Sequence, residues 1–355
     1  MRIHPPLATL PLVALLVVSA WSPSAQAGVC AFGYTGSTVA NSYDIANNVG
    51  ATAAYVVAPG NNPAYNLAPE VSQIVANTGP VFINLKEVIF NPNTLAVSSC
   101  THYERGPSST SKAFFAIRGD YQSRLDTWFA ANDSLFDYNW NGGVRQVYGL
   151  VIHDEANNAC VENWKLHLAA DYVRQKLVSA AYFPIYVAAG YGLRNIPGGA
   201  VSYGLPVTPT GAIDKFPAPL DLIGYSAYDI FNPSNNTDPM NLNAETWSTI
   251  SGKLNQALRS NQKTAGVLRA YCQTNGFEEG VWGIQCPPNW TNWWKLGILS
   301  NNWTNYWKND SRNLFVIAFH WPDAGSLKGT SSLFTLWNYH SHITPNCSIP
   351  FGHDK

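Results

Sequence analysis

The chain has 355 residues, which suits one large α/β barrel or two ordinary domains, and its 46% hydrophobic content is ample for a sizeable core. Only 12% of the residues are charged, about half of the usual share of roughly 25%, and the formal net charge is −1. This balance, without a basic run, excludes the electrostatic footprint of a nucleic-acid-binding protein and favours a neutral or weakly charged ligand.

The N-terminus has the features of a secretory leader. Arg2 precedes an apolar run from Leu10 to Ala20, and the sequence Ser24-Ala25-Gln26-Ala27 that follows has the pattern of a small-residue cleavage site. The run is shorter than the ~20 residues of a membrane span. We therefore expect residues 1–27 to be a signal peptide, and the mature chain, 28–355, to be secreted or periplasmic and free of the membrane.

The cysteines all follow this cleavage site. Because their number is even and the chain is predicted to be exported, we expect disulfide bonds, with buried free thiols as the alternative. Cys272 with Cys286 is the simplest local pairing, and Cys30 with Cys347 would join the two ends. The six residues are Cys30, Cys100, Cys160, Cys272, Cys286 and Cys347.

Short apolar runs alternate with amphipathic stretches along the mature chain. Each run has the length and the β-branched or aromatic content of a strand and is bounded by Gly, Pro or Asn. The predicted strands are 28–35, 52–59, 80–90, 147–155, 184–192, 221–230, 264–272 and 313–322. The predicted helices are 40–49, 67–78, 112–131, 161–181, 244–260, 290–308 and 330–342.

This alternation predicts one domain, a single (β/α)8 TIM-type barrel with elaborated βα loops, over residues 28–355. The gap at 193–220 lacks a helical pattern, and its Pro and Gly content predicts a long loop. An open doubly wound sheet is the alternative fold. No Gly-x-Gly-x-x-Gly or phosphate-loop sequence follows any predicted strand, which disfavours that alternative.

The fourth predicted strand ends on acids. Its apolar residues, Val147 to Ile152, run directly into His153, Asp154 and Glu155. The carboxyl ends of barrel strands face the ligand, and charges there cost desolvation unless they are solvated, paired or used. Glu155 is therefore the first candidate for catalysis. Its alternative role is to stabilise the N-terminus of the next helix, worth about 0.3–1 kcal/mol.

The other predicted strand ends supply a rim rich in aromatic and polar side chains. Trp and Tyr faces with a few acids suit the apolar faces and hydroxyl edges of sugars. Asp229, after strand six, is a further candidate acid, although turn chemistry also explains it. The candidate substrate-binding residues are Asn84, Lys86, His153, Tyr225, Tyr228, Tyr271, Gln273, Trp282, His320 and Trp321.

Other site types have little support. Histidines are scattered, with no HExxH or clustered ligand spacing, so we expect no metal and no cofactor. The Gly-x-Ser-x-Gly sequence of a serine hydrolase is also absent. A monomer acting on a carbohydrate is the expectation.

The Glu that closes strand four resembles the general acid of the large (β/α)8 clan of glycoside hydrolases. That resemblance implies an acid/base role for Glu155. Retaining members of the clan place a second Glu, the nucleophile, at the end of strand seven. This chain has Tyr271-Cys272-Gln273 there, which departs from the two-glutamate mechanism.

Two substitutes for the second Glu remain open. Asp229 is the first, because carboxyls about 5–5.5 Å apart serve retention and about 6.5–9.5 Å inversion. The second is a substrate-assisted mechanism, since Asp154-Glu155, the Ala227-Tyr228-Asp229 sequence and Trp321 are similar to features of hexosaminidases and chitinases. The chitinase DxxDxDxE pattern, however, is absent, with Tyr148, Val151 and His153 at its acidic positions.

The sequence thus predicts an exported glycosidase that cleaves a poly- or oligosaccharide, with Glu155 as general acid/base and Asp229 or Asp154 as second carboxylate. The alternative is a catalytically silent barrel that binds glycans or cell-surface polymer through the same cleft.

Overall fold

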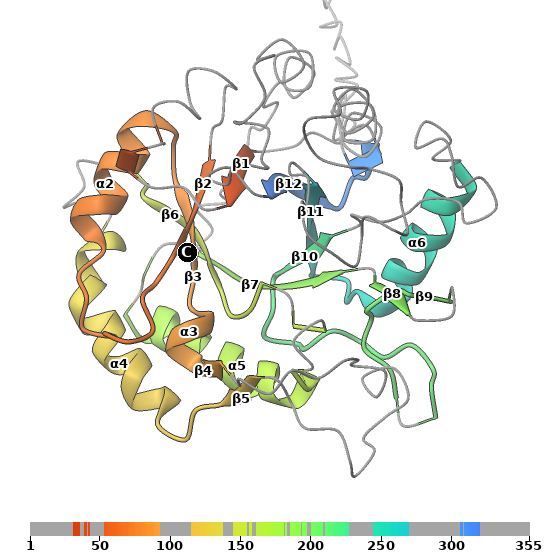
Figure 1. Ribbon diagram of the computed structural model, residues 1–355, viewed down its shortest axis with the longest axis horizontal. Helices are drawn as coiled ribbons and strands as arrows, with labels where there is room; N and C mark the ends of the chain where they lie inside the picture. The colour runs from red at the N-terminus through yellow and green to blue at the C-terminus, as the bar shows by residue number, and fades with distance from the viewer. Residues whose placement is uncertain are drawn as a thin grey trace, which may run out of the picture.

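Eight parallel strands close into a barrel in the computed structural model (Figure 1). Around the barrel their order is β1-β12-β11-β10-β7-β6-β3-β2, and β1 pairs with both β12 and β2. This confirms the predicted (β/α)8 fold. The strands are β1 (Ala31–Thr35), β2 (Ala53–Val57), β3 (Val81–Asn84), β6 (Val147–Val151), β7 (Tyr186–Gly192), β10 (Leu222–Ser226), β11 (Lys263–Arg269) and β12 (Asn313–Phe319).

The structure describes residues 31–35, 39–40, 42, 53–92, 115–137, 145–154, 156–157, 161–180, 182, 185–192, 194–196, 200–208, 210–226, 244–269, 306–307 and 309–319.

The described helices lie on the outside of the barrel (Figure 1). They pack apolar side chains against the outward faces of the strands, with Val71 and Ile74 contributed by α2 and Leu166 and Val173 by α5. Within the described part of the chain, no helix is long and apolar enough to cross a membrane. The helices are α2 (Ala68–Asn77), α3 (Lys86–Ile89), α4 (Tyr121–Asn132), the 3₁₀ turn η1 (Asp133–Leu135), α5 (Asn163–Ser179) and α6 (Ala244–Ala257).

The third predicted strand, 80–90, is too long. β3 stops at Asn84, and the Asn84 side-chain oxygen accepts the Lys86 backbone N–H at 2.9 Å. Asn commonly bonds its own backbone two residues ahead in this way and turns the chain. The short helix α3 follows, and then a hairpin of β4 (Phe90–Pro92) and β5 (Phe115–Ile117) that the sequence pattern did not predict.

The inside of the barrel is filled by alternating large and small side chains. The Phe315 ring lies edge-on to Phe82, with centroids 4.9 Å apart, and also contacts Tyr148 and Tyr186. Small residues such as Ala188 occupy facing positions. Aromatic rings therefore close the interior near the starts of β6, β7 and β12, and they leave the opposite, carboxyl ends of the strands for a ligand.

The connection from β7 to β10 has no helix among its described residues, in agreement with the predicted long loop. It contains a small hairpin of β8 (Arg194–Ile196) and β9 (Ala200–Ser202) and then an irregular segment that reaches β10. Buried Phe216 and Leu220 hold this segment against the barrel, so loop residues cover the core where a regular barrel places a helix.

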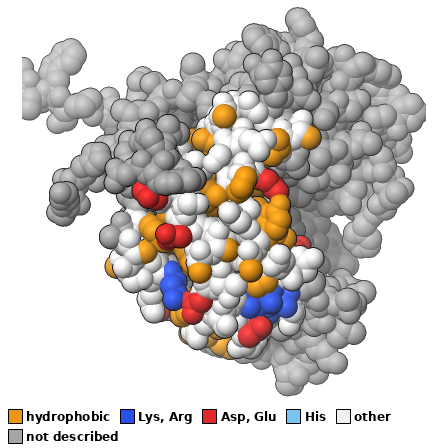
Figure 2. Space-filling model, turned by 90° about the vertical axis from the view of Figure 1, so that its left-hand side faces the viewer, with side chains coloured by type: hydrophobic (Ala, Val, Ile, Leu, Met, Phe, Trp, Pro, Cys, Tyr) orange, Lys and Arg blue, Asp and Glu red, His pale blue; other side chains and the backbone are white. Residues whose placement is uncertain are grey.

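The side of the molecule that carries α2 and α4 shows acidic and basic side chains dispersed among apolar and uncharged ones (Figure 2). This agrees with a chain in which only 12% of residues are charged.

Candidate active site

The pairing of β3 with β6 brings the predicted residues of two strand ends together. Asn84 lies opposite Val151 in this parallel pair, so the residues that follow both strands meet at the same rim. The Lys86 ammonium lies 2.9 Å from a carboxylate oxygen of Asp154. Their side chains are 24% and 29% exposed, which leaves the ion pair accessible to a ligand at the carboxyl end of the barrel.

β6 ends at Val151, earlier than the predicted end at residue 155, but hydrogen bonding to β7 continues beyond it. The Ile152 N–H donates to Ala188 O at 2.8 Å, and the Ala156 N–H donates to Gly190 O at 2.9 Å. Between them, the Gly190 N–H donates to His153 O at 2.6 Å. His153 and Asp154 are therefore fixed by backbone bonds to β7 even though they lie outside the strand.

Gly190 allows this close approach. A Cβ on Gly190 would stand 1.8 Å from the Asp154 carbonyl oxygen, inside any real contact distance. Beyond it, the buried Asn157 side chain accepts the Gly192 N–H at 3.0 Å and donates to the Gly192 carbonyl at 2.7 Å. We did not predict a role for either residue. The sequence does contain an indication of the close contact, because Gly190 and Gly192 lie in one strand and glycines inside a strand often mark a close approach of another backbone.

His153 is fully buried, with 0% of its side chain exposed. Burial lowers its pKa to about 3, so the imidazole is neutral at physiological pH. Its ring packs edge-on against Phe90, with centroids 5.4 Å apart, and its Nδ1 lies 3.5 Å from the Asp154 carboxylate. His153 was predicted to bind substrate. In the structure its buried ring instead contacts the Asp154 carboxylate from inside the protein.

Asp154 stays ionised. Burial raises the pKa of its carboxyl, but the neighbouring His153 and the Lys86 ammonium outweigh burial, and the net pKa lies below its ordinary value. Since His153 is itself neutral near pH 7, Lys86 is the cation that balances Asp154 under those conditions. The rim therefore presents a fixed carboxylate directly before Glu155 in the chain.

The buried His153 should make stability depend on pH. Its folded pKa of about 3 lies below the ordinary 6.5, so between these values the unfolded chain binds a proton that the folded chain does not. The free energy of unfolding must then fall as the pH is lowered, by up to about 1.4 kcal/mol per pH unit. We expect H153Q to flatten this loss between about pH 6.5 and pH 4 in urea denaturation.

The control for this prediction is H167Q, which removes an exposed histidine of α5. The wild-type pH dependence should persist in this variant because His153 is intact. An unchanged slope in H153Q would contradict the assignment of the acid sensitivity to His153.

Two other residues predicted to bind substrate are buried and make internal hydrogen bonds. Asn84 is buried, and its side chain caps the turn into α3. Tyr225 is also buried, in the layer between strands and helices, where its ring contacts Trp307 and its hydroxyl donates to Tyr203 O at 2.6 Å. The alternation of β10 explains this, since Leu222 faces the barrel interior and a residue three positions later faces outward.

The remaining predicted site residues lie outside the described residues, as do the leader and all six cysteines. The residues concerned are Glu155, Tyr228, Asp229, Tyr271, Gln273, Trp282, His320 and Trp321. Among the residues that are described, no group of three or more His, Cys, Asp or Glu side chains is placed to hold a metal ion.

No protein-family model matches the sequence, and no curated protein matches it. Solved structures with a similar fold include PbGH5A, a glycoside hydrolase family 5 enzyme from Prevotella bryantii, at 12% identity over 90% of this chain and 97% of that one, with a TM-score of 0.49. A GH113 β-1,4-mannanase is 10% identical over 89% of this chain and 98% of its own, with a TM-score of 0.46.

Gas2 of Saccharomyces cerevisiae is 9% identical over 87% of this chain, with a TM-score of 0.45, and the match spans 60% of Gas2. The family 5 enzyme, the GH113 mannanase and a GH30 endoxylanase are glycoside hydrolases, and Gas2 was solved in complex with laminaripentaose. At such low sequence identity, the likeness of these structures says nothing about the activity of this chain. The assignment of the fold rests on the strand pairing in the structure of this chain. The chain is similar to (β/α)8-barrel glycoside hydrolases, and its own family is not identified.

Proposed function

We propose that this protein is an exported glycoside hydrolase that cleaves a poly- or oligosaccharide, with Glu155 protonating the glycosidic oxygen. The observation that carries the proposal is the Lys86–Asp154 ion pair, 2.9 Å long and accessible at the carboxyl-end rim of the barrel. Glycosidases need one protonated carboxyl and one ionised carboxylate near the scissile bond. Asp154 supplies a carboxylate held in its ionised form beside the residue that we assign as the acid.

The neighbourhood of Asp154 also bears on the role of Glu155. A fixed negative charge close to a carboxyl raises its pKa, which favours the protonated form that an acid catalyst needs. Lys86 opposes this effect, so the pair sets the balance of charge at the rim. We therefore propose that Asp154 and Lys86 together adjust the protonation of Glu155.

The second carboxylate is Asp229 or Asp154. Asp154 is already in an ion pair with Lys86, which makes it a weaker nucleophile and suits it better to orienting a substrate group or stabilising positive charge. Asp229 is the remaining candidate for nucleophile or base in a two-carboxylate mechanism. If D229N loses turnover and D154N keeps part of it, the two-carboxylate mechanism is supported. The reverse ranking favours substrate assistance.

A direct assay tests the proposal. Purified mature protein, residues 28–355, is incubated with a panel of β-linked glucans, mannans, xylans, galactans and polyuronides, and new reducing ends are counted. Release that depends on Glu155 is the expected result. Mass measurement of protein recovered after export tests the predicted cleavage after Ala27.

A silent glycan-binding barrel is the second candidate. One sequence observation favours it, because Tyr271-Cys272-Gln273 stands where retaining relatives of this barrel type would have a Glu. Glycan-array binding without hydrolysis over a long incubation would select this alternative, and any Glu155-dependent cleavage would reject it.

A further inference from the structure

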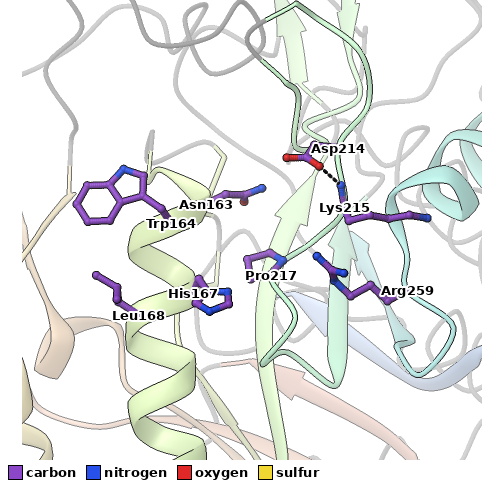
Figure 3. A pocket seen from close by; sticks show the side chains of 8 residues that line it. All are labelled: Asn163, Trp164, His167, Leu168, Asp214, Lys215, Pro217 and Arg259. Carbon is purple, nitrogen blue, oxygen red and sulfur yellow. Dashed lines mark hydrogen bonds between the residues drawn. The ribbon is translucent and has the colours of Figure 1, made fainter.

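A pocket lies on the outside of the barrel, and neither Lys86 nor Asp154 lines it. Its volume is about 320 Å³, at the lower end of the range for small-molecule sites. One wall is the first part of α5, and the other is the irregular segment before β10 together with Arg259 (Figure 3). It occupies the gap left between α5 and α6 by a β7–β10 connection whose described residues include no helix.

The irregular wall is held rigidly. The Gln262 side chain donates to Pro217 O and to Leu220 O, both at 2.9 Å. The Lys215 ammonium donates to Leu258 O at 2.8 Å, and Arg259 Nε donates to Phe216 O at 2.9 Å. A wall fixed in advance lowers the entropy cost of binding, which distinguishes this pocket from a gap between loops.

The lining combines an aromatic edge with a cation. Trp164 is 57% exposed and Leu168 is 44% exposed, one turn apart on α5. The Lys165 ammonium lies 5.3 Å from the centroid of the Trp164 ring, so a second cation stands beside the exposed indole. Figure 3 shows Asn163 and His167 projecting from α5 toward Pro217 and the Arg259 guanidinium. Arg259 uses Nε for the wall, and its terminal nitrogens have no acceptor among the described residues.

These features match a sugar that carries a carboxylate. An indole face stacks on the apolar face of a pyranose ring, and the two terminal nitrogens of a guanidinium bind a carboxylate in a bidentate manner. Lys215 and Arg259 outnumber Asp214 among the charged lining residues, which also favours an acidic ligand.

We propose that this pocket is a second glycan-binding site for an acidic polysaccharide, with the carboxylate of one uronate unit on Arg259 and a neighbouring sugar ring of the same chain on Trp164. This inference rests on the proposed function, because it assumes that the protein acts on a polysaccharide. The first turns of α5 follow the rim segment that carries Asp154, whereas Arg259 precedes the start of β11, so the pocket lies along the side of the barrel between the rim and the amino ends of the strands. A second contact with one polymer raises the effective concentration of substrate at the rim.

Calorimetric titration tests the proposal. The E155Q protein, which should not cleave its ligand, is titrated with an oligogalacturonate and with a neutral cello-oligosaccharide of equal length. We expect the acidic chain to bind more tightly. Its affinity should fall about tenfold in W164A and in R259Q, equivalent to about 1.4 kcal/mol. R259K, which keeps the charge without the planar fork, should recover part of this loss.

V178A is the matched control, because Val178 is an exposed apolar residue at the far end of the same helix. Unaltered titrations of W164A and R259Q would overturn the site, and equal binding of the neutral chain would overturn its assignment to an acidic sugar. The failure of the proposed hydrolase is recognised separately, since wild-type protein would then release no reducing ends whether or not the pocket binds.

Discussion

Replacing Glu155 by Gln should lower kcat on natural polysaccharide by about 10²- to 10⁴-fold, the usual contribution of a general acid. The amide has nearly the shape of the carboxyl but cannot protonate the departing glycosidic oxygen. The loss should be much smaller on an aryl glycoside with a strongly acidic phenol, because that leaving group departs without a proton. Comparing both substrates separates loss of acid catalysis from a general loss of activity.

The control is E162Q, which changes another glutamate seven residues further along, directly before α5, where Glu162 pairs with Lys165 in the first turn of the helix. Its turnover should stay near wild type. Thermal unfolding of E155Q should match the wild-type protein, since the exchange changes no side-chain volume. Reducing-sugar release by E155Q near the wild-type rate would reject Glu155 as the acid.

Replacing Gly190 by Ala should destabilise the protein by about 3 kcal/mol or more, at the upper end of the range for overpacking in a core. The new methyl would stand 1.8 Å from the Asp154 carbonyl oxygen and 2.5 Å from the carbonyl carbon. Because this obstacle is backbone, no side-chain rotation relieves it, and the rim segment must move away from β7. We expect a lower urea midpoint together with reduced turnover.

Gly224→Ala is the control for this prediction. Gly224 lies opposite Gly190 in the pairing of β7 with β10, but its nearest neighbours would be 3.4 Å and 3.6 Å from an added Cβ, ordinary contact distances. G224A should therefore keep most of its stability and activity. Equal unfolding midpoints for G190A and G224A would contradict the proposed role of Gly190 in seating the His153–Asp154 segment.

The barrel could be predicted from the sequence because every barrel strand is a short apolar run separated from the next by polar or helical residues. Each predicted run overlaps one strand of the closed sheet. Strand ends were less predictable. β3 stops at Asn84 because that side chain bonds the backbone of Lys86, and apolar residues continue past the turn into α3. Periodicity cannot distinguish such a run from one long strand.

The candidate site could be predicted only in part. Lys86 and Asp154 each follow the end of a predicted strand, so the sequence placed both at one rim. The pairing of β3 with β6 makes these two strand ends neighbours. The direction of Tyr225 was not predictable from its position near a strand end, since one residue of register moves a side chain between the inside and the outside of a barrel.

By itself, then, the sequence determined the number and order of the barrel strands and the concentration of acids after the fourth, because these depend on local apolar pattern and chain order. Only the tertiary structure decided that Asp154 pairs with Lys86, that His153 is buried and neutral, and that a pocket opens between α5 and α6. Each of these depends on residues distant in the chain. Their contacts arise from strand pairing and close packing, which no local pattern records.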